Sequence, residues 1–274
     1  MVLNGIFDDK FHAAVEPLRV AGAGTEAAGP WLAALVGLVR PRNVLEVGMG
    51  YTTPYLAAAL ASAAEQTRLE SAALAAKSRR ALAGDGLGDD WLFAEPPLAA
   101  PDFHLAGYQP RMVAVDNLSI EGSSAGRVTE VLRQLGLDHL VSVANCDLTE
   151  ADDHLPADFT PIDLAWVDAY ECLYFFDHYW ERINPDGGLL AMHYLMTYPE
   201  GEAVLRYFRG YQQAHPGELE IVNLLEPHKL MQNSVTLLRR TSGAGGRERL
   251  GKAGHVRYSD ALTDDARTHA GTGE

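Results

Sequence analysis

The stretch Val44-Leu45-Glu46-Val47-Gly48-Met49-Gly50-Tyr51-Thr52-Thr53 decides the fold of this chain, because it joins an apolar strand to a helix through a glycine-rich turn. Gly48 and Gly50 let the backbone approach a ligand closely, and the first turn of the following helix offers free N–H groups. A ligand is therefore expected at this turn. Taken alone, the stretch leaves open a tight strand-to-helix turn that binds nothing.

Segments rich in apolar and β-branched residues alternate with segments of helical period, which predicts a mostly parallel sheet covered by helices. The further predicted strands are Arg111–Asp116, Leu140–Ala144, Ile162–Asp168, Gly188–His193, Leu219–Leu225 and Ser234–Arg240. The predicted helices are Thr25–Val39, Pro54–Ala83, Ser123–Leu135, Glu171–Ile183 and Glu200–Ala214. A short link that contains proline joins the last two strands, which predicts a hairpin and an antiparallel final strand.

Acidic residues stand where predicted strands end. Asp116 ends the second strand, Cys146-Asp147-Leu148 follows the third, and Asp168 ends the fourth. Open α/β sheets bind ligands outside the carboxyl ends of their strands, so these acids and the glycine turn are expected to share one crevice. There a carboxylate after the second strand can accept the hydroxyls of a ribose, and one after the third can accept from an adenine amine. Each acid alone could instead be a helix cap or a turn former.

From about residue 25 to residue 240 the chain resembles the class I S-adenosylmethionine-dependent methyltransferases. Glu46–Thr52 is similar to the first motif of that family in its small-molecule O-methyltransferase variant, Asp163–Asp168 to the fourth motif, and Asn184–Leu190 to the turn into the fifth strand. The resemblance implies a Rossmann-like three-layer sandwich. Its seven-stranded sheet would have the order 3-2-1-4-5-7-6, with the last strand antiparallel, an N-terminal helical cap and an insertion before strand two.

The resemblance also implies S-adenosylmethionine as the cofactor and a set of residues around it. Gly48 and Gly50 would lie under its methionine portion, Asp116 on its ribose and Asp147 near its adenine, while Glu46 would orient the turn or reach the amino group through water. The remaining expected contacts come from Met49, Tyr51, Thr52, Thr53, Asn117, Cys146, Leu148 and Asp168. Asp116 departs from the usual spacing, because it follows Glu46 by 70 positions instead of about 20. A nicotinamide dinucleotide is disfavoured, because Thr53 occupies the third glycine position of its fingerprint.

His193 is the candidate general base, because it ends the predicted fifth strand beside the crevice and an imidazole suits proton transfer at neutral pH. A structural histidine that caps the next loop is the alternative. Asp168 is the second catalytic candidate. The carboxylate-rich magnesium site of catechol-type methyltransferases is incomplete here, because His193 and Tyr194 stand where those enzymes have an Asp-Asn pair. A transition metal on Asp168 and His193 stays open, but no metal is expected.

The acceptor of the methyl group is expected to be a small metabolite, amino-acid-derived or phenolic, that is methylated on oxygen or nitrogen. Its candidate contacts are Tyr170, Glu171, Tyr194 and Trp91. Asp168 and Glu171 beside aromatic rings could instead hold a cationic amine or guanidine, although acids at a helix start are common without a ligand. A cofactor-binding partner subunit that has lost its chemistry is the non-enzyme alternative.

Four segments are expected: an N-terminal helical cap at 1–40, the cofactor-binding domain at 41–240, an insertion within it at 66–110, and a flexible glycine-rich tail at 241–274. About 45 residues separate the expected end of the first crossover helix, near Glu65, from the second strand, which is long for a connection in a compact domain. This stretch is predicted to form a lid over the substrate pocket. The alternatives are that it only adds packing to the domain or that it forms a dimer contact.

Composition limits the partners. Twenty-two Lys and Arg residues against 37 Asp and Glu give a net charge of −15, which repels nucleic acids and anionic membranes. A small-molecule substrate is expected, and a homodimer is left open. Residues Met1–Lys10 lack the pattern of a secretory signal, and Cys146 and Cys172 lack the spacing of a disulfide scaffold or a zinc site. The expected location is the cytoplasm.

Overall fold

The computed structural model describes residues 7–84, 86–242 and 260–271. The chain forms two compact units, one made of residues 1–62 and 110–245 and the other of residues 63–109 and 246–274. In the described part of the chain, no helix is long and apolar enough to cross a membrane.

The first unit is built on a seven-stranded sheet with the order β3-β2-β1-β4-β5-β7-β6, as predicted. Only β7 of these seven strands runs in the opposite direction, and it pairs antiparallel with both β5 and β6, whereas β1 to β5 form parallel pairs. The strands are β1 (Asn43–Val47), β2 (Arg111–Val115), β3 (Val141–Ala144), β4 (Leu164–Val167), β5 (Asp186–His193), β6 (Leu219–Leu225) and β7 (Ser234–Thr241). The central strands β1 and β4 are buried along their whole length, as expected for a sheet that is covered on both faces.

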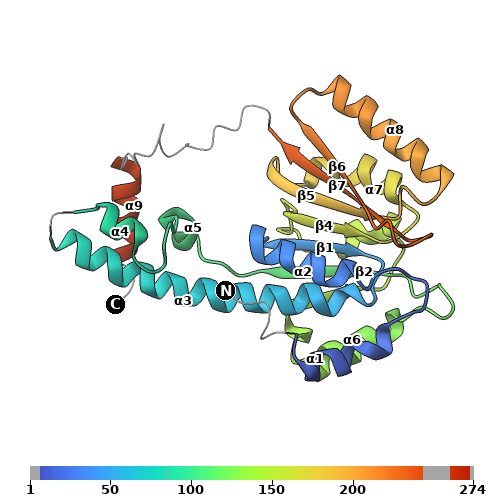
Figure 1. Ribbon diagram of the computed structural model, residues 1–274, viewed down its shortest axis with the longest axis horizontal. Helices are drawn as coiled ribbons and strands as arrows, with labels where there is room; N and C mark the ends of the chain where they lie inside the picture. The colour runs from blue at the N-terminus through green and yellow to red at the C-terminus, as the bar shows by residue number, and fades with distance from the viewer. Residues whose placement is uncertain (1–6, 85, 243–259, 272–274) are drawn as a thin grey trace. The chain divides into compact units, whose positions relative to one another are not determined.

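Helices cover both faces of this sheet (Figure 1). One face packs against α1 (Asp9–Val15), η2 (Glu16–Leu18), α2 (Ala28–Val39), the first turns of α3 (Thr52–Leu82) and α6 (Ala125–Leu135). The other packs against η4 (Leu148–His154), α7 (Cys172–Tyr179), η5 (Trp180–Arg182) and α8 (Pro199–Ala214), while η3 (Asp138–Leu140) leads into β3. The three layers and the helical N-terminal cap agree with the predicted architecture.

The second unit contains the later turns of α3 together with α4 (Asp89–Phe93), α5 (Pro101–Leu105) and α9 (Asp260–Gly271). Its small core joins Leu74 of α3, Trp91 and Leu92 of α4, and Ala266 of α9. Lys77 reaches into this unit, donates to the carbonyl oxygen of Ala94 and lies 4.8 Å from the centre of the Trp91 ring. The insertion is therefore folded around its own apolar core.

Two boundary predictions differ from the structure. The helix predicted over Pro54–Ala83 is confirmed by α3, so the end near Glu65 from which the length of the insertion was counted is wrong. α3 contains no glycine or interior proline after its first turn, and its later apolar residues pack in the second unit. The predicted flexible tail is helical over residues 260–271, because Ala266 is buried in that core; residues 243–259 of the tail lie outside the described residues. The lid function of the insertion stays a prediction.

Candidate functional site

The register of the sheet brings Gly48, Asp168 and His193 to one level at the carboxyl ends of three neighbouring strands. Val47 of β1 is opposite Val167 of β4, and Val167 is opposite Met192 of β5. Side chains alternate between the two faces of a strand, so the side chains of Asp168 and His193, one position further, lie on the same face. That face is the one covered by α2 and the start of α3.

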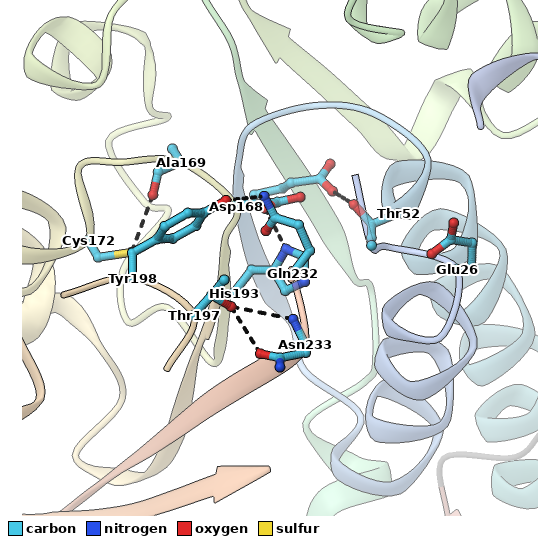
Figure 2. Close-up of polar contacts among 12 residues, drawn as sticks. Glu26, Thr52, Asp168, Ala169, Cys172, His193, Thr197, Tyr198, Gln232 and Asn233 are labelled. Carbon is cyan, nitrogen blue, oxygen red and sulfur yellow. Dashed lines mark hydrogen bonds and ion pairs between the residues drawn. The ribbon is translucent and has the colours of Figure 1, made fainter. Parts of the chain in front are cut away.

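His193 and Asp168 form a hydrogen-bonded pair. His193 Nδ1 lies 2.9 Å from Asp168 Oδ1, as Figure 2 shows. An ionised carboxylate can only accept a hydrogen bond, so this contact places the imidazole proton on Nδ1 and leaves the lone pair on Nε2. The His193 side chain is 1% exposed, and its Nε2 atom is buried without a hydrogen-bond partner among the described residues. The pair therefore presents an oriented nitrogen that can take up a proton.

The glycine turn requires glycine at position 48. Gly48 has a φ of +90°, and a Cβ atom built there would lie 2.5 Å from the carbonyl oxygen of Asp168. The turn is held from outside by Asp116, whose Oδ2 accepts a hydrogen bond from the Met49 N–H at 3.0 Å. It is held from inside by Thr53, whose hydroxyl accepts from the Gly50 N–H. Met49 itself is buried in the core and Thr53 is a turn-forming residue.

Glu46 lies fully buried on β1, beneath the glycine turn and in register with Trp166 of β4. Thr52 donates a hydrogen bond to its Oε1 at 2.6 Å, whereas its Oε2 has no hydrogen-bond partner among the described residues. Burial raises the pKa of the Glu46 carboxyl to about 8. The predicted role in orienting the turn is consistent with the contact to Thr52, and the unpartnered oxygen leaves capacity for one more polar group.

The acids after β2 and β3 lie at the same edge of the sheet. Asp116 Oδ1 also accepts from the Leu118 N–H at 2.7 Å, which closes a tight turn, and Asn117 donates to the carboxylate of Asp147. Cys146 and Leu148, the neighbours of Asp147, are instead buried in the core on the α7 face. The structure thus brings Asp116, Asn117 and Asp147 together and leaves Cys146 and Leu148 as packing residues.

The predicted substrate contacts separate into two groups. Tyr194 directly follows His193, with ring centres 5.2 Å apart, and burial raises the pKa of its hydroxyl. The Tyr170 side chain is 81% exposed with its ring 5.9 Å from that of Tyr194, and Glu171 is exposed at the start of α7. Trp91, by contrast, is 4% exposed in the core of the second unit, where its indole donates to Ser78.

Several residues around the carboxyl end of β5, or packed against Gln232, were not predicted. Gln232 and Asn233 precede β7, Tyr198 precedes α8, and Gly24 lies in the loop before α2. The predicted sheet order could have indicated Gln232 and Asn233, because a strand that runs antiparallel beside β5 must begin at the carboxyl end of β5. Trp166 was expected only as part of a strand, although its ring lies 5.7 Å from that of His193. Gly24 and Tyr198 carry no sequence signal of this kind.

A metal site is not apparent in this region. Among the described residues, no group of three or more His, Cys, Asp or Glu side chains is arranged to hold a metal ion. The Asp168 and His193 side chains bond to each other. The arrangement is that of a hydrogen-bonded carboxylate and imidazole beside the glycine turn.

Comparisons with known proteins agree on the fold. No protein-family model matches this sequence, and no curated protein is detectably similar to it. Among solved structures, the O-methyltransferase TomG from Streptomyces achromogenes, in complex with SAM, aligns with a TM-score of 0.54 at 18% identity over 85% of this chain and 90% of that chain. An O-methyltransferase from Bacillus cereus, in complex with SAH, aligns with a TM-score of 0.52 at 15% identity over 86% of this chain and 89% of that chain. The chain therefore has the class I methyltransferase fold.

Proposed function

We propose that this chain is an S-adenosylmethionine-dependent methyltransferase that acts on an oxygen or nitrogen atom of a small molecule, with His193 as its general base. The observation that carries the proposal is the placement of the Asp168–His193 pair at the same level as the glycine turn. The structural neighbours add support, because they are O-methyltransferases with SAM or SAH bound and one takes part in Tomaymycin synthesis.

The glycine turn fits the cofactor on two observations of this structure. Gly48 has no side chain, so its backbone approaches the Asp168 carbonyl closely and holds the glycine turn beside the Asp168–His193 pair. Glu46 keeps one carboxyl oxygen without a hydrogen-bond partner in the described chain. Asp116 and Asp147 stand at the ends of β2 and β3, where hydroxyl and amine donors of a nucleoside would meet carboxylates.

Bound S-adenosylmethionine supplies a methyl group on a positively charged sulfur and leaves as a neutral thioether. The chain must align an acceptor atom with this methyl group and remove its proton. His193 Nε2 takes that proton, while Asp168 holds the ring through Nδ1 and stabilises the positive charge that the imidazole gains. With the cofactor bound, loss of the proton to His193 Nε2 would leave the acceptor atom a lone pair for the new bond to the methyl carbon, and the sulfur would keep the electrons of the bond that breaks.

The acceptor is a small molecule in this proposal. The chain carries a net charge of −15, which makes a polyanionic nucleic acid a poor substrate. The site lies between a buried histidine and half-buried tyrosines, an environment that suits a compact acceptor.

His193→Ala tests the base. We expect turnover to fall about 10²-fold to 10⁴-fold while the affinity for S-adenosylhomocysteine, measured by calorimetry, stays within about threefold of wild type. If His193 were a metal ligand, a chelator would inactivate the wild type and added metal would restore it. If its role were structural, the variant would lose thermal stability and keep its turnover in the cold.

A further inference from the structure

Gln232 has an unusual backbone conformation that no step of the proposed reaction explains. It precedes β7 with a φ of +48°, in the left-handed region that costs a non-glycine residue about 1 kcal/mol or more. Tyr194, the residue after His193, has the same φ of +48°. Strained residues of this kind persist only where surrounding contacts hold them, and they gather at functional sites.

The contacts that hold Gln232 come from the N-terminal loop and from Tyr198. Gly24 packs so closely that a Cβ atom there would lie 2.3 Å from Gln232 Cβ and 2.6 Å from its carbonyl oxygen. Lys229 fixes that loop by donating to the Gly24 carbonyl and pairing with Glu26 at 3.6 Å. Gln232 Nε2 donates to the hydroxyl of Tyr198 at 3.3 Å (Figure 2). These contacts hold the backbone of Gln232 and the Nε2 end of its amide.

These contacts leave the other end of the amide without a partner. Gln232 Oε1 is buried and has no hydrogen-bond donor among the described residues. A buried acceptor that makes no hydrogen bond costs about 1–3 kcal/mol, so such atoms are usually satisfied by a molecule that the chain itself does not provide. Because Nε2 is already used by Tyr198, the missing partner of Oε1 must be a donor.

The topology places Gln232 near the carboxyl end of β5, where the catalytic pair lies. β7 runs antiparallel to β5, so that His193 is opposite Val235 and the Tyr194 N–H donates to the carbonyl of Ser234. Gln232 therefore lies just beyond the carboxyl end of β5, and Figure 2 shows its side chain in the same region as that of His193. A chain of ring contacts connects them, from His193 to Tyr194 at 5.2 Å and from Tyr194 to Tyr198 at 5.8 Å.

We propose that Gln232 is a positioning residue that selects acceptors carrying a second hydrogen-bond donor beside the atom that is methylated. The inference rests on the proposed function. One donor of the acceptor loses its proton to His193 Nε2 and receives the methyl group, while the neighbouring O–H or N–H donates to Gln232 Oε1. The substrate class is therefore small hydroxy- or amino-substituted molecules with two adjacent donors. Analogues without the second donor leave Oε1 buried and unpaired, and are rejected for that reason.

Paired acceptors test this selection. The pairs are 2-aminophenol against 2-methylphenol and 2-(hydroxymethyl)phenol against 2-ethylphenol, in which a methyl group replaces the neutral second donor. For the wild type we expect kcat/KM to favour the donor-bearing member by about tenfold or more. Gln232→Met keeps the length of the side chain and removes the acceptor, so the preference should fall below about threefold, mainly through KM. The matched control is Gln134→Met on the exposed face of α6, which should keep the wild-type preference.

A crystal structure of the complex with S-adenosylhomocysteine and 2-aminophenol gives a readout that does not depend on turnover. We expect the second donor of the probe within about 3.2 Å of Gln232 Oε1, and an ordered water there in its place would contradict the selection. An Oε1 turned onto a protein N–H, or one with no donor near it, would overturn the inference. So would an unchanged preference in Gln232→Met. Failure of the proposed function is distinct, because the wild type would then not bind S-adenosylhomocysteine in calorimetry.

Discussion

Asp168 and His193 lie directly opposite each other at the ends of two neighbouring parallel strands, with Nδ1 of the imidazole 2.9 Å from Oδ1 of the carboxylate. Asp168 directly follows β4, which is fully buried, and His193 ends β5, which is buried from Gly188 onward, so the pair is fixed by the sheet. The unpartnered Nε2 then has a defined direction. A base that is already oriented loses little freedom when it meets its substrate.

Asp168→Asn tests whether the carboxylate orients the base. The amide can donate to Nδ1, which favours the tautomer with the proton on Nε2 and removes the lone pair needed for proton uptake. We expect turnover to fall about 10²-fold or more, with S-adenosylhomocysteine affinity within about threefold of wild type. Turnover is measured by a kinetic assay and affinity by calorimetry on the same preparations. Full activity in the variant would remove Asp168 from the mechanism.

Gly48→Ala tests the glycine turn. The added Cβ would lie 2.5 Å from the Asp168 carbonyl oxygen at a φ of +90°, so both the turn and the end of β4 must shift. We expect the free energy of unfolding to fall by about 2 kcal/mol or more and S-adenosylhomocysteine affinity to fall by at least about tenfold. Gly126→Ala is the matched control, because a Cβ in that exposed position of α6 meets nothing within 4 Å. Equal behaviour of the two variants would contradict this account of the turn.

Glu46→Gln tests the buried carboxyl. Its pKa is about 8 in the folded chain and near 4.5 when exposed, so the folded state keeps a proton that the unfolded chain releases between these values. Proton binding by Glu46 therefore stabilises the folded state fully below about pH 4.5, and this stabilisation is lost as the pH rises through about 8. The amide variant should flatten this fall in the free energy of unfolding, measured by urea denaturation at pH 5 and pH 8. The exposed Glu150→Gln serves as the control that keeps the wild-type pH dependence.

Ala266→Asp tests the core of the second unit. The Ala266 side chain is fully buried on α9, and an unpaired charge there costs several kcal/mol. We expect earlier thermal unfolding and faster proteolysis within residues 63–109. Ala261→Asp at the exposed start of the same helix should leave both unchanged. If residues 63–109 of Ala266→Asp resisted proteolysis as well as they do in the wild type, α9 would not stabilise this unit.

The sequence by itself determined the elements and their order. A buried strand followed by Gly48 and Gly50, alternating strands and helices, and the resemblance to a known family were sufficient for the sheet order and for the placement of Asp116, Asp168 and His193 at one edge. These features are local, since strand periodicity, glycine conformation and strand ends are written within a few neighbouring residues. The helical period also predicted α3 along nearly its whole length. The helix at residues 260–271 was missed, because its burial depends on apolar contacts with segments far from it in the chain.

Only the tertiary structure decided what each site residue contacts. The Asp168–His193 bond, the burial of Glu46 that raises its pKa, and the packing of Gly24 against Gln232 join residues separated by between 6 and 208 positions. Trp91 was expected at the substrate and lies in the second core instead. The physical reason is that hydrogen bonds, desolvation and close packing depend on distances of a few ångströms in space, which spacing along the chain does not specify.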